Sequence, residues 1–356
     1  MQNYIFFLYI NYSGSKKVGR QNQIHHQVPH FNVKNIGRKE ITNINNKGMD
    51  SYKTIREVFA LWKKEKQMYV KQSTMATYEL HISKHIMPAF GNSSMLHEDD
   101  VRAFVEEKTK KGLSQKTVKD IVMILGLLHR YGVKHGLLPV SEWSVRWSQP
   151  ERGQSLDVFT IKHYRCLMNH CLNNLTNKNI GILICICTGM RIGEICALKW
   201  SDIDGETKSI RVNRTLGRIY FSGGGDRRTQ IIEGTPKTRN SMREIPMSNK
   251  LAKILLPLAK VLNADYYVLT NSDTPIEPHT YRNYYKRLLS KLGLPAVKFH
   301  GIRHSFATRC VESKCDYKTL SVILGHSNIS TTLNLYVHPD AEQKKKCIDK
   351  MLKSLG

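Results

Sequence analysis

The sequence predicts a mostly α-helical protein with a small antiparallel β-sheet, divided into two domains. Three observations support this prediction. Helical periodicity with capping residues runs through residues 54–138 without a strand-like segment. From about residue 160 helical segments return, but four short strand-like segments with glycine-rich turns interrupt them. Residues 139–156, between these parts, contain Pro, Gly and Ser and have no helical period. A chain of 356 residues is long enough for each part to bury its own core.

The first domain, residues 51–138, is expected to contain four helices. Thr54 and Glu57 are spaced as a capping box, so a helix should begin after Thr54. In the fourth helix apolar residues recur every three or four positions, which predicts a buried stripe. The many lysines of this domain have few matching acids, which favours contact with phosphate over simple solvation. Ser73 or Thr74 should open the second helix and Ser114 the fourth, and Asp99 or Asp100 should lie in the first turn of the third.

Residues 139–156 are expected to form a linker, with Trp143 and Trp147 packed against a neighbouring part of the chain. The second domain is expected over residues 157–339 and a final helix over residues 340–356. The landmarks of the second domain are a helix from Thr160, a buried helix ended by Gly189, a helix at 190–200, strands at 209–217, 220–224, 229–234 and 242–247, and helices from Ser248.

The composition favours a polyanionic partner. The formal net charge is +26, which suits DNA, RNA or an anionic membrane, although a merely soluble basic protein has the same balance. No run approaches the ~20 apolar residues that a bilayer span needs, and the apolar stretch Tyr4–Ile10 lacks the flanks of a signal peptide. We therefore expect a cytoplasmic protein. Its eight cysteines match no zinc motif and are expected to be buried, reduced thiols.

Residues 1–50 differ from the rest of the chain. They are rich in Asn, Gln, Lys and His and show little periodicity. One hypothesis is that natural translation starts at Met49, where the regular helical pattern begins; the other is a small DNA-binding arm.

Two candidate cations lie in the first half of the second domain. Arg191 stands at the start of a helix, where backbone N–H groups and a guanidinium can converge on an anion. It could instead pair with Glu194 on an exposed face, or Glu194 could aim it. Lys237 lies between two strand-like segments and is expected on a hairpin turn. There it is either a solvated lysine or a mobile ammonium that protonates a leaving alkoxide.

Four further candidates lie close together near the C-terminus. His300 and Arg303 are three residues apart and should share a helix face, although such a histidine is often a core residue. His326 follows a glycine that is typical of a helix end. Tyr336 ends a short segment that Ser330 could cap, and taken alone it would be assigned to the core.

Together these six residues suit attack on a phosphodiester. Phosphoryl transfer needs positive charge around the equatorial oxygens, an in-line nucleophile and an acid for the leaving group. A tyrosine hydroxyl, with a reference pKa of ~10, becomes a useful nucleophile when a cationic cage or a nearby base helps it ionise. No acidic cluster is placed to hold Mg²⁺, so we expect the cage to replace a metal and predict no cofactor.

Four motifs carry a family resemblance. TGMRIGE, TPKTRNSMREIP, HGIRHSFATR and LGHSNISTTLNLY resemble, in order and spacing, those of the tyrosine recombinase (phage integrase) family, of the mobile-element integrase type. The resemblance covers residues 54–350, and the four motifs are specific together, whereas each alone is weak. It implies a site-specific DNA recombinase that works through a 3′-phosphotyrosyl link, without metal or ATP.

The resemblance also implies a role for each candidate residue. The scissile phosphate would be held by Arg191 and Arg303 and hydrogen-bonded by His326; Lys237 would protonate the departing 5′ oxygen, His300 would act as acid or base, and Tyr336 would attack. All six positions carry the usual residue types of the family, which predicts an active enzyme.

The family fold is a C-shaped clamp on double-stranded DNA, with a helical core-binding domain and an α+β catalytic domain. The resemblance implies a homotetramer on synapsed recombination sites. An excisionase or a host DNA-bending protein is a further candidate partner. The tail would dock on an adjacent protomer or on its own domain. Its apolar stripe consists of Cys347, Ile348, Met351, Leu352 and Leu355. The family's arm-binding sheet domain is not evident in residues 1–48.

Three alternatives stand beside the mobile-element integrase. The first is a recombinase that resolves chromosome dimers, and the second is a type IB topoisomerase, which shares the chemistry but exchanges no partners. The third, of a different class, is a DNA-binding regulator with lapsed catalysis, against which the complete set of six residues speaks.

Overall fold

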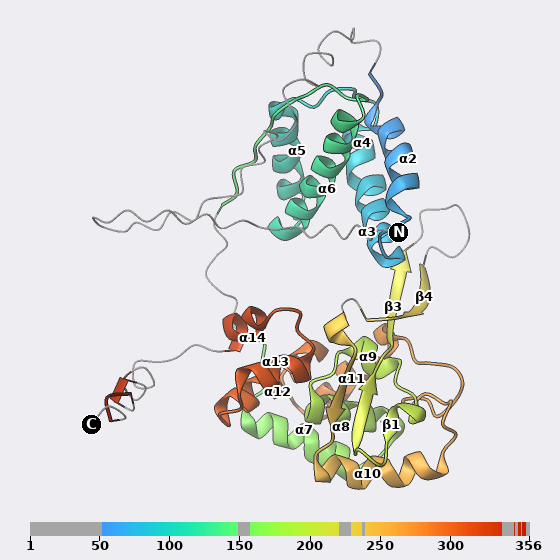
Figure 1. Cartoon of the computed structure of the whole chain (residues 1–356), viewed down its shortest axis with the longest axis vertical. Coiled ribbons are helices and arrows are strands. Elements are labelled where there is room, and N and C mark those ends of the chain that lie inside the picture. The colour runs from blue at the N-terminus through green and yellow to red at the C-terminus, as the bar shows by residue number, and fades with distance from the viewer. Residues whose placement is uncertain are drawn as a thin grey trace, which may run out of the picture.

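The structure is a computed structural model that describes residues 52–148, 157–220, 229–236 and 239–336, together with residues 345, 348, 349 and 351–353. The expectations for the N-terminal extension and for Lys237 lie outside the described residues. The chain forms two units, with helices α2–α6 in one and α7–α14 with all five strands in the other (Figure 1). In the part of the chain that is described, no helix has the length and apolar character of a membrane span.

The first unit, called the helical unit, covers residues 52–148. Its elements are α2 (Ile55–Lys66), α3 (Gln72–His81), the π-helix η2 (Ile82–Ile86), α4 (Met87–Phe90), α5 (Glu98–Lys110) and α6 (Gln115–Lys134). The predicted capping box is confirmed: Thr54 N donates to Glu57 Oε2 at 2.9 Å, and the Thr54 hydroxyl accepts from Glu57 N. Ser114 caps α6 as predicted. The second helix begins before Ser73, because Lys71 occupies its N-cap position in extended conformation.

The first half of the predicted linker packs back on the helical unit. The Trp143 ring lies against Gly126 and His129 of α6. The Lys119 ammonium lies 5.3 Å from the centroid of the Trp147 ring, within cation–π range. The predicted packing of both tryptophans is therefore confirmed.

The second unit, called the C-terminal unit, covers residues 157–336. Its helices are α7 (Ile161–Asn173), α8 (Asn177–Thr188), α9 (Ile192–Cys196), α10 (Asn249–Val261), α11 (Pro278–Lys291), α12 (Phe299–Glu312), α13 (Tyr317–Leu324) and α14 (Ile329–Tyr336). Gly189 ends α8 as predicted, in the left-handed conformation. The helix predicted over residues 190–200 is shorter, because Leu198 leaves the helix and accepts a backbone hydrogen bond from Val268 at 2.8 Å.

The strands form two antiparallel sheets rather than the single predicted one. The three-stranded sheet has the order β1 (Ile203–Asp204), β2 (Ser209–Val212) and β5 (Arg243–Pro246), and the two-stranded sheet pairs β3 (Thr215–Tyr220) with β4 (Thr229–Gly234). Because β4 pairs with β3 and β5 pairs with β2, the segment between β4 and β5 connects two sheets. The two strands on either side of Lys237 therefore do not pair with each other, while Lys237 itself lies outside the described residues.

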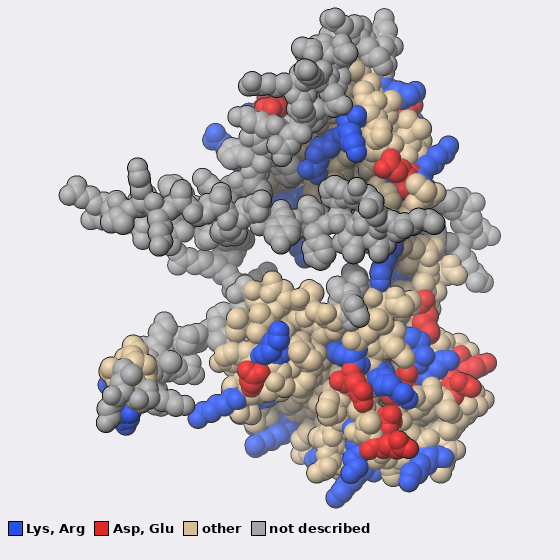
Figure 2. All heavy atoms as spheres, viewed as in Figure 1, with Lys and Arg blue, Asp and Glu red and all other residues tan. Residues whose placement is uncertain are grey.

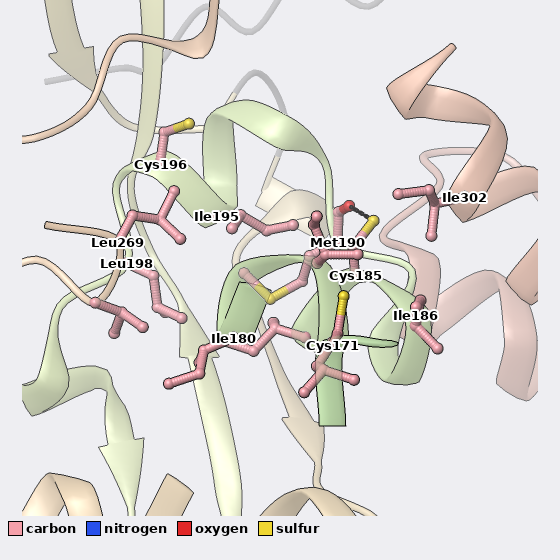
Figure 3. Close-up of a cluster of buried hydrophobic side chains, with 14 of the residues drawn as sticks. Cys171, Ile180, Cys185, Ile186, Met190, Ile195, Cys196, Leu198, Leu269 and Ile302 are labelled. Atoms are coloured by element: carbon pink, nitrogen blue, oxygen red, sulfur yellow. Dashed lines mark hydrogen bonds between the residues drawn. The ribbon is translucent and has the colours of Figure 1, made fainter. Parts of the chain in front are cut away.

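The core of the C-terminal unit surrounds α8, whose residues are buried almost throughout. Cys171 and Cys185 lie among apolar side chains, as Figure 3 shows, and Cys185 Sγ donates to Met190 O at 3.3 Å. Burial raises the pKa of Cys171 to about 12, so this thiol stays protonated. The prediction of buried, reduced thiols is confirmed for Cys171, Cys185 and Cys196. It is wrong for Cys166, which is exposed, and the thiols of Cys187, Cys310 and Cys315 are only partly buried. Ile302 of α12 belongs to the same cluster (Figure 3), so this core supports the helix that carries His300 and Arg303.

The two units touch where the β3–β4 hairpin reaches α3 (Figure 1). Lys71, at the start of α3, donates through Nζ to Pro236 O at 2.8 Å and to Thr235 O at 3.3 Å. Lysine and arginine side chains are spread over both units on the face seen in Figure 2. The helical unit thus holds the backbone directly before Lys237.

Candidate active site

Arg303 is the most deeply buried cation of the candidate site. Its side chain is 1% exposed, and it donates through Nη1 to Gly189 O and through Nη2 to Leu324 O, each at 2.8 Å. Gly189 follows α8 and Leu324 ends α13, so the guanidinium satisfies carbonyl groups at two helix C-termini. Burial, together with the neighbouring Arg191, lowers the pKa of Arg303 to about 9. The group therefore remains a cation at neutral pH.

Arg191 precedes α9 and meets Arg303 at the end of α13. Its Nη2 donates to Gly325 O at 3.3 Å, beside the Leu324 carbonyl that Arg303 uses. Its Nη1 donates to Glu194 Oε1 at 2.9 Å, and its backbone N–H donates to Oε2 at 2.9 Å. Glu194 is only 3% exposed, so the alternative of an ion pair on an exposed face is wrong. The carboxylate fixes both the backbone and the guanidinium of Arg191.

Arg243 on β5 is a site residue that the sequence reasoning missed. Its Nη1 and Nη2 donate to the two carboxylate oxygens of Glu194 at 3.1 and 3.0 Å, and its Nε donates to Ile323 O at 2.6 Å. Burial alone would raise the pKa of Glu194, but the hydrogen bonds and charges of Arg243 and Arg191 outweigh it and leave that pKa below its usual value. Arg243 lies within the quoted motif TPKTRNSMREIP, which is the only signal of its role in the sequence.

His326 and His300 lie in the field of these cations. His326 follows Gly325, which adopts the left-handed conformation (φ 66°), and its Nδ1 lies 2.8 Å from Thr332 Oγ1 of α14. Burial and the charges of Arg303 and Arg191 lower the pKa of His326 to about 4. Burial, His304 and Arg303 lower the pKa of His300 to about 4. Both imidazoles are therefore neutral at pH 7, and the site presents uncompensated positive charge that an anion would offset.

Tyr336 is the last residue of α14 and is 8% exposed. This helix begins at Ile329 rather than after Ser330, and the Asn328 side chain accepts from Ser330 N at 2.8 Å. The predicted capping role of Ser330 is therefore wrong. Burial raises the pKa of Tyr336, although the charges of Arg303 and Arg191 act in the opposite direction. The two guanidinium groups thus favour a phenolate at this position, whereas burial disfavours it.

His304 is the second residue that the sequence reasoning missed. Its Nδ1 lies 2.6 Å from Tyr336 Oη, and its ring packs edge-on against His300 with centroids 4.5 Å apart. His304 follows Arg303 directly and comes one helical turn after His300, so the i,i+4 spacing was the signal that could have found it.

The structure thus brings five of the six predicted residues to one place. Arg191, His300, Arg303, His326 and Tyr336 gather around the C-terminal end of α13, while Lys237 lies outside the described residues. Among the residues that the structure describes, no group of three His, Cys, Asp or Glu side chains is placed to hold a metal ion.

Comparison with known proteins gives two family models that match the chain. The model of the phage integrase family matches residues 157–343, and that of the phage integrase N-terminal SAM-like domain matches residues 54–97. A protein named tyrosine recombinase XerC-like, from Caldanaerobacter subterraneus subsp. tengcongensis, is 30% identical over 312 residues, or 80% of this chain and 78% of the relative. The ICEBs1 integrase of Bacillus subtilis is 24% identical over 76% of this chain and 75% of its own length.

Solved structures share the fold. The Tn1549 transposon integrase in complex with transposon right end DNA superposes with a TM-score of 0.70 and 21% identity, over 84% of this chain and 100% of that chain. A lambda integrase from a tetramer bound to a Holliday junction superposes with a TM-score of 0.58 and 17% identity, over 85% and 87%. The predicted fold class, mostly α-helical with small antiparallel β structure, is confirmed.

Proposed function

Because the chain belongs to the phage integrase family of tyrosine recombinases, we propose that it is a site-specific recombinase that cleaves and rejoins double-stranded DNA through a phosphotyrosyl link at Tyr336. The observation that carries this assignment is the convergence of two guanidinium groups, Arg191 and Arg303, on the carbonyls of Leu324 and Gly325, with Tyr336 packed against Leu324. Positive charge around the phosphate and a nucleophile are two of the groups that phosphoryl transfer requires, and the third is an acid for the leaving group.

In the proposed mechanism the scissile phosphate binds between the two guanidinium groups. Arginine N–H groups form charge-assisted hydrogen bonds to phosphate oxygens and neutralise the charge that develops there. Tyr336 Oη gives up its proton to a neighbouring imidazole as it forms the bond to phosphorus. The bond to the 5′ oxygen breaks, and Lys237 supplies the proton that this oxygen takes up. The 3′-phosphotyrosyl product conserves the energy of the broken bond, so a second DNA strand can reverse the step without ATP.

Glu194 would support this chemistry without touching the DNA. It is held by Arg243, and it in turn holds the backbone and the guanidinium of Arg191. A guanidinium fixed in this way has little conformational freedom left to lose when the phosphate binds. His326, which is hydrogen-bonded to Thr332, would complete the phosphate contacts from α14.

The proposed biological role is integration and excision of a mobile element. Support comes from relatives named ICEBs1 integrase and transposase of transposon Tn916, the latter 31% identical over 44% of this chain. The second candidate, resolution of chromosome dimers, is favoured by the relative named XerC-like. Recovery of the DNA joined by the protein would separate the two roles, because an integrase joins an element end to a target site. With DNA as substrate, we place the protein in the cytoplasm.

We propose a clamp and a tetramer as the working form, with an excisionase or a host DNA-bending protein as further candidate partners. The helical unit would grip one face of the duplex and the C-terminal unit the other. The tail supports assembly: Ile348 and Leu352 are each 56% exposed in the single chain, so these apolar side chains could pack on an adjacent protomer. The lambda integrase is known as a tetramer on a Holliday junction.

A library of nicked duplexes tests the function directly. Cleavage next to a nick releases the short 5′-hydroxyl strand, so the protein stays covalently attached to its target. We expect an adduct on denaturing gels, in EDTA as well as without it, and sequencing of the trapped DNA would give the site. No adduct under any condition would refute the proposed chemistry, and an adduct abolished by EDTA would show that a metal takes part.

Replacement of Lys237 tests the proton donor. Lys237→Ala should slow cleavage of normal DNA about 10²- to 10⁴-fold, the contribution usual for general acid catalysis. A substrate whose 5′ oxygen is replaced by sulfur should restore the rate, because a thiolate leaves without a proton. Lys250→Ala, which removes an exposed lysine at the start of α10, is the matched control. If Lys237→Ala cleaves the sulfur substrate as slowly as it cleaves normal DNA, Lys237 is not the proton donor.

A further inference from the structure

The hydroxyl of Tyr336 already has a hydrogen-bond partner that none of the six expected residues supplies. His304 Nδ1 lies 2.6 Å from Tyr336 Oη, within the range of a strong hydrogen bond between neutral groups. The two residues come from different elements, α12 and α14, and both are largely removed from solvent. The contact therefore joins a titratable ring to the atom that the proposed function makes the nucleophile.

His300 is differently placed. Its ring packs against His304 at a centroid distance of 4.5 Å and an angle of 85°. The order along α12 and across to α14 is His300, then His304, then Tyr336. This arrangement places His300 behind His304, as a neighbour that fixes its ring plane.

We propose that His304 is a catalytic residue that accepts the proton of Tyr336 during DNA cleavage and returns it during rejoining; this inference rests on the proposed function. As the Oη–phosphorus bond forms, the Oη–H bond breaks and the proton passes to His304 Nδ1. The phosphorus–5′ oxygen bond breaks in the same step, and the departing oxygen takes its proton from Lys237. In the reverse step the imidazolium protonates the leaving phenolate, so protons and electrons balance over the cycle.

The surroundings keep His304 ready for this role. Burial and the charge of Arg303 lower the pKa of His304, so its ring is neutral at pH 7 and Nδ1 can accept a proton. The raised pKa of Tyr336 keeps the hydroxyl protonated until the phosphate arrives. When the scissile phosphate binds the guanidinium groups, its negative charge favours the imidazolium at the moment of transfer. In the described part of the chain, the charged and titratable groups recorded against His304 are Arg303 and His300 on α12 and Tyr336 on α14.

His304→Asn tests the proposal, because the asparagine amide can hydrogen-bond near the position of Nδ1 but cannot accept a proton. We expect normal DNA binding and a cleavage rate reduced about 10²- to 10⁴-fold. In the wild type, the cleavage rate should fall as the pH drops below neutrality, because the base becomes protonated. This acid limb of the pH–rate profile should be absent from the variant. Retention of the limb in His304→Asn would overturn the proposal, whatever the rate.

A fluorinated tyrosine at position 336 gives a second, independent measurement. Its phenol is a stronger acid and needs no base, so it should restore most of the cleavage lost in His304→Asn but none of that lost in His326→Asn. Lack of restoration in His304→Asn would overturn the proposal. If His304→Asn fails to bind DNA, the fluorinated tyrosine is placed at position 336 of the otherwise wild-type protein. The acid limb of its pH profile should then weaken, and an unchanged limb would overturn the proposal.

The controls separate this inference from the proposed function. His279→Asn, an exposed histidine of α11, should leave rate and pH profile unchanged. A wild-type protein that forms no covalent adduct would defeat the proposed function itself. A wild-type adduct together with a retained acid limb in His304→Asn would defeat only the role of His304.

Discussion

Tyr336→Phe is expected to bind its DNA site with wild-type affinity and to form no covalent adduct. The substitution removes one oxygen and keeps the ring, which packs with Ala307, Leu320 and Leu324. The lost hydrogen bond to His304 should cost about 1 kcal/mol of stability, far less than would unfold the unit. Phosphate contacts from Arg191 and Arg303 are untouched, so affinity for DNA should persist. Loss of the nucleophile removes every step that passes through the phosphotyrosyl link.

The measurement for Tyr336→Phe combines a mobility shift at low salt with a denaturing gel after incubation on nicked DNA. Tyr317→Phe on α13 is the matched control, because its hydroxyl belongs to an exposed side chain; it should bind and cleave as the wild type does. A covalent band from Tyr336→Phe would place the nucleophile at another residue. Lost binding without lost folding would show that the hydroxyl belongs to the DNA contacts.

Local signals in the sequence were sufficient for several helix ends in both units. Thr54, Thr160 and Gly189 were recognised because a cap depends on one side chain, or one left-handed residue, and its immediate neighbours. The same reasoning failed at Ser330, since Asn328, two residues earlier, accepts the hydrogen bond instead. Competing caps within one turn are decided by the path of the preceding chain, which local spacing does not specify.

Strand partners could not be predicted, because pairing is a long-range property. The segments that became β4 and β5 follow each other in the sequence and suggested a hairpin. In the fold β5 pairs with β2, some 30 residues earlier, with Ile210 opposite Ile245. Both isoleucines are buried, so the register that places them together in the core determines the pairing.

The same contrast between local signals and long-range contacts applies to the residues of the site. Arg243 and His304 also lie within the quoted motifs, but their roles depend on partners 49 and 32 positions away. The residues next to an arginine in a strand, or to a histidine in a helix, do not indicate which distant residue it contacts. Arg243 shows how much of the site depends on such contacts, because it is buried at 4% side-chain exposure against Glu194.

Arg243→Met should lower the free energy of unfolding of the C-terminal unit by about 3 kcal/mol, the lower end of the usual cost of breaking a buried ion pair. The methionine fills much of the volume of the arginine stem. The buried carboxylate of Glu194, however, loses Arg243 and keeps only Arg191 of these two cationic partners. Arg218→Met is the matched control: that arginine pairs with Glu277 but is 47% exposed, so its loss should cost at most about 1 kcal/mol. Urea unfolding followed by tryptophan fluorescence would measure both.

The pH dependence distinguishes the ion pair from packing. In the wild type the pKa of Glu194 is lowered, so its contribution to stability is present above the unfolded pKa and disappears as pH falls through the folded one. Without Arg243, burial should raise that pKa, and the carboxyl should take up a proton at higher pH. The stability difference between the two proteins should therefore shrink as the pH is lowered, and Glu194→Gln in the Arg243→Met background should recover part of the loss. A difference that stays constant with pH would mean that Arg243 acts through its packing, and Glu194 would then orient Arg191 without its help.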